Sequence, residues 1–127
     1  MAQLSLILGA LGGLLSVAFG AFGAHALRGR LDDYARGVYE TAVQYQFYHS
    51  LALLAVALLL LQYPGSALLK SSTVLFVLGI LVFSGSLYIL SFTGLRWLGA
   101  VTPLGGLAFI AGWTCLLAAG WQLLGNS

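Results

Sequence analysis

The organisation of this chain follows from residues 32–62, which read DDYARGVYETAVQYQFYHSLALLAVALLLLQ. The stretch begins with charged side chains, continues through aromatic, amide and histidine side chains, and ends in a hydrocarbon run from Leu51 to Leu61. Gly37 is its only glycine, and it contains no proline. A helix over this stretch would be about 45 Å long, more than the ~30 Å core of a bilayer requires. We therefore expect one helix that starts in water and crosses a membrane, with the other apolar segments packed around it.

The composition excludes most water-soluble folds. The chain has 127 residues, of which 61% are hydrophobic and 6% are charged, whereas soluble domains carry about 25% charged residues. The mean hydropathy is +1.01, and the net charge of +2 gives no indication of a nucleic-acid partner. The prediction is an all-α integral membrane protein, a single domain over residues 1–127 with four transmembrane helices in a compact bundle. The expected helices span about 3–27, 32–62, 70–92 and 103–124.

Local signals set these boundaries. Asp32 and Asp33 suit a helix N-terminus, and Asp32 has the favoured spacing for an ion pair with Arg36. Residues 63–66 read as a turn, so the third helix is expected to begin at Lys70. Thr102-Pro103 resembles an N-cap followed by proline at the first helical position. Tyr34, Tyr39, Tyr45 and Tyr48 are expected to lie at successive depths near the membrane interface.

The first apolar segment has a signal peptide as its alternative interpretation, because Ala24-His25-Ala26 fits an A-x-A cleavage site. However, no Lys or Arg precedes the apolar run, and the run exceeds the length of a signal-peptide core. A retained transmembrane helix is therefore expected.

Small residues recur along the first and fourth helices at spacings that place them on one helix face, where they allow close backbone contact in lipid. We expect the first helix to be central and packed, not lipid-facing, and we favour a partner helix of the same chain over a second copy. The predicted packing residues are Gly9, Gly12, Gly13, Ser16, Gly20, Ala24, Ala108 and Gly112.

Arginine and lysine counts predict the orientation in a cytoplasmic (cell) membrane. Arg28, Arg30, Arg36 and Arg96 lie on one side of the predicted bundle, and Lys70 lies on the other. By the positive-inside rule, loops 28–40 and 93–102 are cytoplasmic and both termini are extracytoplasmic.

Ionisable side chains at membrane depth form the candidate polar site. His25 and His49 are expected at the same depth, with His49 against His25. The candidate residues are His25, Tyr45, Gln46, His49, Ser84 and Tyr88. The functional interpretations are a proton relay, a site for a quinone or lipid headgroup, or haem held by two histidines. The favoured alternative is an interhelical clasp, in which imidazole and amide groups fix helix packing.

No complete catalytic set is visible, since the chain has three carboxylates, all in the polar stretch that begins the second helix. There is no phosphate-binding loop, no nucleophile elbow and no metal-ligand cluster beyond the two histidines. Cys115 lies in an apolar run and reads as a packing residue. We expect no enzyme activity, no catalytic residues, no cofactor and no metal.

Four sequence blocks carry a family resemblance: GAFGAHAL (20–27), YQFYHSLALL (45–54), FSGSLYIL (83–90) and TPLGG (102–106). They resemble the signature blocks of the uncharacterised small-membrane-protein family of bacterial YgdD- and YwdK-like proteins and eukaryotic transmembrane protein 256 (domain of unknown function 423). The resemblance implies a four-helix protein of the bacterial cytoplasmic membrane type and implies no activity. It places His25, Gln46, His49, residues 84–88 and Thr102-Pro103 inside family motifs, which favours a shared polar site or shared packing contacts.

Two functions are consistent with these observations. The favoured one is a structural or interaction component of the membrane, with the lipid bilayer, further copies of itself or a larger membrane complex as partners. The alternative is a small transporter or a lipid- or quinone-binding protein whose polar site surrounds His25 and His49.

Overall fold

The computed structural model describes residues 1–125, which fold into helices joined by short turns. The elements are α1 (Ala2–His25), α2 (Asp33–Gln62), α3 (Ala67–Gly79), the π-helical turn η1 (Ile80–Ser84), α4 (Gly85–Thr93) and α5 (Leu98–Leu124). Because α3, η1 and α4 follow one another without a break, they form one rod, the α3–α4 rod. Four helical stretches are therefore long and apolar enough to cross a membrane, which confirms the predicted class.

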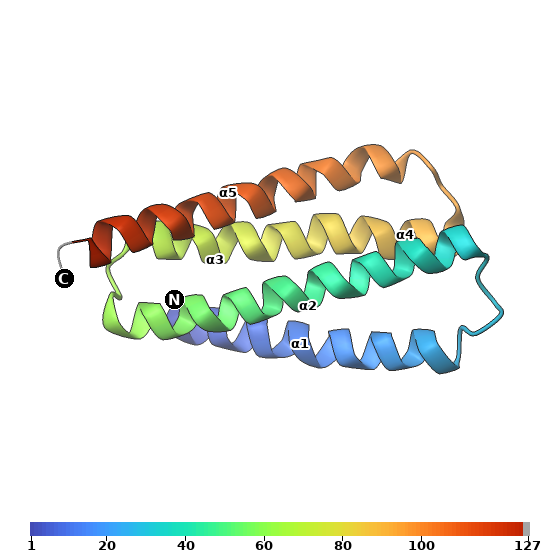
Figure 1. The fold of residues 1–127 in the computed structure, drawn as a ribbon, viewed down its shortest axis with the longest axis horizontal. Coiled ribbons are helices and arrows are strands. Elements are labelled where there is room, and N and C mark those ends of the chain that lie inside the picture. Colours follow the sequence, from blue (N-terminus) through green and yellow to red (C-terminus); the bar gives the residue numbers. More distant parts are fainter. Residues whose placement is uncertain (126–127) are drawn as a thin grey trace.

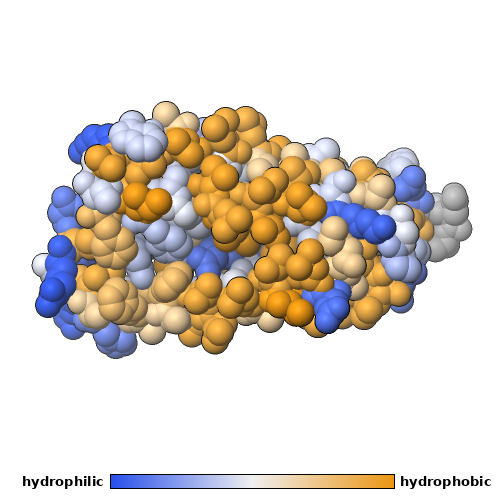
Figure 2. All heavy atoms as spheres, turned by 180° about the vertical axis from the view of Figure 1, so that it is seen from behind, coloured by the Kyte–Doolittle hydropathy of each residue, from blue (hydrophilic) through white to orange (hydrophobic). Residues whose placement is uncertain are grey.

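The four rods run side by side, with α1 on one edge of the bundle and α5 on the opposite edge (Figure 1). Between them lie α2, which packs on α1, and the α3–α4 rod, which packs on α5. The connections α1–α2 and α4–α5 share one end, here called the loop end, and both chain termini lie near the other (Figure 1). Hydrophobic groups cover much of the face seen in Figure 2, and hydrophilic groups gather most densely at the loop end.

Three helix boundaries follow from identifiable caps. Asp32 caps α2, as predicted, and its Oδ1 accepts a hydrogen bond from the Ala35 amide at 2.7 Å. Ser66 caps α3 by accepting from the Leu69 amide at 3.2 Å. The third transmembrane helix therefore begins three residues before the predicted Lys70. At the loop end, α4 stops at Gly94, whose φ of 70° is a left-handed conformation that glycine adopts without strain.

The predicted start of the fourth transmembrane helix is wrong. Helix α5 begins at Leu98, so Pro103 lies inside it and Thr102 is not its N-cap. Proline is tolerated there because the carbonyl that it leaves without a partner, that of Gly99, belongs to an exposed residue close to the helix start. The Thr102 hydroxyl instead donates to the Leu98 carbonyl at 3.1 Å.

The prediction of a central first helix is also wrong. Only Ser5, Gly9 and Ser16 of α1 are buried, and its large apolar side chains, such as Leu14 and Val17, are mostly exposed. A single face of small residues provides contact with one neighbouring helix, which is α2. The most enclosed helix is α2 itself, whose Leu53, Val56 and Leu60 enter the core. The expectation that other helices pack around residues 32–62 is therefore confirmed for α1 and the α3–α4 rod.

The partner of the α1 small-residue face is a helix of the same chain, as favoured from the sequence. A Cβ atom on Gly9 would lie 2.9 Å from the Ser50 carbonyl oxygen, one on Gly12 would collide with the Ser50 hydroxyl, and one on Gly20 would contact Val43. Gly13 meets nothing within 4 Å, and Ala24 is exposed, so these two do not form the contact. Gly23, which the sequence analysis passed over, packs against the Tyr39 ring.

Glycines also bring α5 close to the α3–α4 rod. A Cβ atom on Gly105 would lie 2.7 Å from the Cα atom of Phe83, so the two backbones touch at the π-helical turn. The predicted packing residue Gly112 receives Phe76, at 2.8 Å from an added Cβ atom. Ala108 is half-buried in the same helix. The wider π turn therefore lies where backbone contact with α5 is closest, a feature that the sequence analysis did not anticipate.

Candidate functional site

Gln46 connects three helices through its side-chain amide. Its Nε2 donates to the Gly12 carbonyl on α1 at 2.9 Å, and its Oε1 accepts from the Tyr88 hydroxyl on α4 at 2.6 Å. The side chain is buried, at 4% exposure. Because an amide both donates and accepts, one residue of α2 can satisfy a backbone carbonyl and a phenol at once. Gln46 is thus the polar junction of α1, α2 and α4.

Hydroxyl groups along the α1–α2 contact bond to backbone carbonyls, two of them within their own helix and one across the contact. Ser50 donates to the Gln46 carbonyl at 2.7 Å, and Ser16 donates to the same Gly12 carbonyl that Gln46 uses, also at 2.7 Å. Nearer the chain termini, Ser5 on α1 donates to the Leu53 carbonyl on α2 at 2.7 Å. Backbone carbonyls of helices retain a second lone pair, so these bonds form without breaking the helical ladder.

His49 lies on a neighbouring face of α2 and contacts α3 and α5. Its Nδ1 is 2.7 Å from the Tyr45 carbonyl, and its Nε2 accepts from the indole N–H of Trp113 at 3.0 Å. Since an indole N–H can only donate, Nε2 must be unprotonated, and the proton resides on Nδ1. His49 is therefore held as one neutral tautomer with both ring nitrogens occupied.

Aromatic rings enclose this imidazole. The Phe109 ring stacks on it with a centroid separation of 3.5 Å and an interplanar angle of 8°. Phe76 lies 5.6 Å away on α3, and Trp113 meets the ring edge-on at 5.8 Å. Tyr45 stacks at 6.1 Å and also packs on Phe83 at 4.6 Å. His49 is left 5% exposed, so its surroundings favour the neutral ring.

His25 does not join this arrangement. It is exposed in the last turn of α1, beyond Gly23, which packs on Tyr39. Tyr39 and His49 are about 15 Å apart along α2 at the usual helical rise. The predicted contact between His49 and His25 is therefore wrong, and one iron atom cannot be held by both. The error arose from treating both helices as if they entered the membrane at the same depth.

The remaining predicted site residues act as interhelical hydrogen bonders. Ser84, in the π-helical turn, donates to the Ala42 carbonyl on α2 at 2.8 Å, and Tyr88 bonds Gln46. The structure thus brings Tyr45, Gln46, His49, Ser84 and Tyr88 onto or against the middle of α2. They form two groups, because Gln46 faces α1 and α4 whereas His49 faces α3 and α5.

Several contributors were missed from the sequence. Trp113 and Phe109 are one helical turn apart on α5, and a tryptophan in the middle of a transmembrane helix, away from the interface, is itself a signal for a buried hydrogen-bond partner. Ser72 donates to the Gly112 carbonyl at 2.9 Å, and Ser86 pairs with Thr102 at 2.6 Å. Tyr39, predicted as an interfacial aromatic, is 5% exposed and donates to the Phe19 carbonyl.

Every buried side-chain nitrogen or oxygen within residues 1–125 has a hydrogen-bond partner. This matters in lipid, where an unsatisfied polar group is costly. The His49 imidazole and the Gln46 amide therefore both find their hydrogen-bond partners within the chain.

Comparison with known proteins identifies one family of unknown function and several membrane-protein relatives. Residues 19–106 match the family described as a protein of unknown function (DUF423). The chain is 46% identical to the UPF0382 membrane protein SH2409 of Staphylococcus haemolyticus, over 97% of this chain and 99% of that protein. It is 47% identical to the UPF0382 membrane protein YwdK of Bacillus subtilis, over 94% and 97%. It is 41% identical to the UPF0382 inner membrane protein YgdD of Escherichia coli K12, over 93% and 89%.

No solved structure matches this chain. The family match covers α2, the α3–α4 rod, the end of α1 and the start of α5, and the relatives cover nearly the whole chain at more than 40% identity. The family resemblance noted in the sequence is confirmed, and this membrane protein of unassigned activity belongs to the DUF423 family.

Proposed function

We propose that this protein is a non-catalytic structural or interaction component of the cell membrane, with partners that are membrane proteins or further copies of itself. The observation that carries this proposal is the state of His49, whose two ring nitrogens are bonded to the Tyr45 carbonyl and the Trp113 indole. A histidine in this state acts as a clasp between helices.

The same observation argues against proton transport and acid–base catalysis. A relay histidine must gain a proton on one nitrogen and release one from the other. Protonation of Nε2 would break the Trp113 bond and leave a charged ring desolvated inside an apolar bundle. Gln46 is engaged in the same way, so the imidazole and the amide in the middle of the bundle are both occupied by bonds within the chain.

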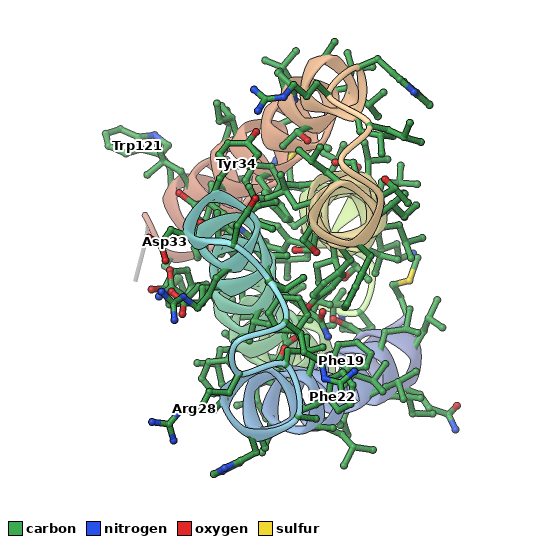
Figure 3. The ribbon with its side chains drawn as sticks, turned by 90° about the vertical axis from the view of Figure 1, so that its right-hand side faces the viewer. Phe19, Phe22, Arg28, Asp33, Tyr34 and Trp121 are labelled. Atoms are coloured by element: carbon green, nitrogen blue, oxygen red, sulfur yellow. The ribbon has the colours of Figure 1, made fainter. Side chains whose placement is uncertain are left out.

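The two edge helices supply surface for partners. On α5, large apolar side chains point outward, and the exposed fractions of Leu117 and Trp121 are 77% and 86%. Trp121 extends away from the bundle in the end-on view (Figure 3). Such a face is covered by lipid or by another transmembrane helix, and both are compatible with a membrane component.

The proposal includes an orientation. Loops 28–40 and 93–102 would face the cytoplasm, because four arginines lie at the loop end and Lys70 lies toward the other. Both termini would then be extracytoplasmic. A C-terminal reporter that is active only in the cytoplasm should be silent, and a cytoplasmic signal would reverse this assignment.

The test of function is a paired measurement on the intact chain. Native purification from gently solubilised membranes should recover a stoichiometric protein partner or an oligomer, and His49→Gln should retain it while the protein melts at a lower temperature. Liposomes containing the wild-type protein should show no proton flux above empty vesicles under an imposed pH gradient. Flux that disappears in His49→Gln would contradict the proposal and establish a transporter.

A further inference from the structure

An apolar groove separates α1 from the α3–α4 rod on one side of the bundle. Near the loop end it contains a cavity of about 550 Å³ between Phe19 and Phe22 of α1 and Tyr88 and Phe92 of α4. A second cavity of about 240 Å³ continues toward the middle, sharing Phe19 and Tyr88 and extending to Val77. Together these two cavities are called the lateral groove. A hollow with hydrophilic atoms at its base is visible in the orange face of Figure 2.

The lateral groove is suited to a hydrocarbon chain. Its walls are aliphatic and aromatic, and its polar members, Gln46, Tyr88 and Tyr39, have hydrogen-bond partners within the protein. Val77 and Phe92 mark its ends, about 22 Å apart along the rod at the usual helical rise. One bilayer leaflet is about 15 Å deep, so a complete acyl chain fits along it.

A charged pocket adjoins the groove at the loop end. This arginine pocket, of about 380 Å³, is lined by Arg30, Asp32, Thr93 and Arg96, and it shares Phe92 with the groove. Asp32 is engaged as the α2 cap, and Arg96 lies over the Tyr34 ring at 5.1 Å. The salt bridge within residues 1–125 joins Arg36 to Asp33. Neither Arg30 nor Arg96 forms a salt bridge in this part of the chain. Two arginines against one aspartate leave the pocket cationic.

We propose that the lateral groove and the arginine pocket together bind one anionic phospholipid. Its phosphate lies at Arg30 and Arg96, and one acyl chain follows the groove past Phe92, Phe22 and Phe19. The two features share Phe92 as a lining residue, and their order matches a lipid, with the cationic pocket at the membrane surface and the apolar groove at depth. Arginine binds phosphate through paired N–H groups. Two cationic side chains also attract a lipid with a net negative charge, whereas the quaternary ammonium of a zwitterionic lipid with the same chains offsets that attraction.

The chain offers a pair of matched glycines to test the groove. An added Cβ atom meets nothing within 4 Å at Gly85, which lines the groove, or at Gly13, which does not. Gly85→Leu would therefore extend a side chain into the groove from an unobstructed Cβ position, and Gly13→Leu would add the same side chain elsewhere. For the charge, Arg30→Gln with Arg96→Gln is compared with Arg28→Gln. Arg28 points away from the bundle, on the other side of α1 from Phe19 and Phe22 (Figure 3).

The experiment is native mass spectrometry of the full chain with added phosphatidylglycerol or phosphatidylcholine carrying the same acyl chains. We expect one phosphatidylglycerol to be retained at least tenfold more strongly than phosphatidylcholine. Gly85→Leu and the Arg30/Arg96 double variant should weaken this retention at least tenfold, and Gly13→Leu and Arg28→Gln should not. Equal retention of both lipids, or unchanged retention in Gly85→Leu, would overturn the proposal.

A measurement on the wild-type chain avoids dependence on variant folding. Phosphatidylglycerol with a photoreactive group in one acyl chain should crosslink to peptides that contain Phe19, Phe22 or Phe92. Crosslinks confined to the outer face of α5, or products that join two copies of the chain across the groove, would contradict a lipid in this position.

Discussion

Helices α1 and α5 occupy opposite edges of the bundle, yet they are attached by different means. On α1 the contact to α2 consists of small residues and side chains that bond backbone carbonyls, such as Ser5 to Leu53 and Gln46 to Gly12. On α5 the contact to the α3–α4 rod consists mainly of aromatic rings seated on glycines, such as Phe76 on Gly112 and Phe109 on Gly79. The Ser72–Gly112 and Ser86–Thr102 hydrogen bonds lie beside them.

The difference shows two solutions to one physical problem. In lipid the hydrophobic effect does not draw helices together, so association depends on van der Waals contact and hydrogen bonds. The α1 side gains a few hydrogen bonds, each worth about 1 kcal/mol, along a narrow contact. The α5 side gains broad packing because aromatic rings fit against glycines, which have no side chain. The α5 side should therefore be the more sensitive to changes in shape, and the α1 side to the loss of polar groups.

The largest expected effect is at Gly105. Gly105→Ala places a Cβ atom 2.7 Å from the Cα atom of Phe83, and a backbone cannot rotate away as a side chain can. We expect a loss of about 3 kcal/mol of unfolding free energy, the upper range for overpacking. Reversible unfolding in mixed micelles measures it. Gly120→Ala, in the same helix with nothing within 4 Å, should change stability little, and equal losses in both variants would refute the shape argument.

The second prediction concerns the His49 clasp. His49→Gln removes the stacked ring, and we expect a loss of about 2 kcal/mol from one interhelical hydrogen bond and one aromatic contact. A double-mutant cycle with Trp113→Phe should give a coupling of about 1 kcal/mol, because both single changes break the same bond. Trp121→Phe is the control, since the Trp121 side chain is 86% exposed. Additive effects of the His49 and Trp113 changes would show that the bond does not contribute.

The third prediction tests close approach on the α1 side. Gly12→Ala should cost about 1 kcal/mol, less than Gly105→Ala, because the colliding group is the Ser50 hydroxyl and not backbone. Thermal melting in detergent gives the comparison. In a Ser50→Ala background the same change should cost markedly less, since the colliding atom is absent. Gly13→Ala should be neutral in both backgrounds. A cost at Gly13 equal to that at Gly12 would show that the contact face of α1 is assigned wrongly.

The fold could be read from the sequence because length, hydropathy and capping are local properties. The four spans, the Asp32 cap and the α1 face toward another helix of the chain required no knowledge of tertiary contacts. Where two local signals competed, the prediction failed. Arg36 pairs with Asp33 and not with Asp32, because the Asp32 carboxylate is already used by the Ala35 amide.

The site was harder to predict because it depends on how helices are offset from one another. Gln46, His49, Ser84 and Tyr88 were recognisable as polar groups at depth, but their partners lie on other helices. Nothing in the sequence specifies that Gln46 meets Gly12 and that His49 meets Trp113, since these pairings depend on helix order and axial shift. The π-helical turn within the α3–α4 rod and the division into two polar groups both emerged only from the structure.

The smallest expected effect is at Tyr88, and it tests whether the polar junction at Gln46 adds to stability. Tyr88→Phe keeps the ring, which packs edge-on against Phe19 and Tyr39, and removes the 2.6 Å hydrogen bond to Gln46. The expected loss is about 0.6 kcal/mol, the average for such bonds between transmembrane helices. Tyr48→Phe, at an exposed position, is the control for the loss of a phenol. A loss at Tyr88 no greater than at Tyr48 would mean that the hydrogen bond between α4 and Gln46 adds nothing to stability and that ring packing alone holds this contact.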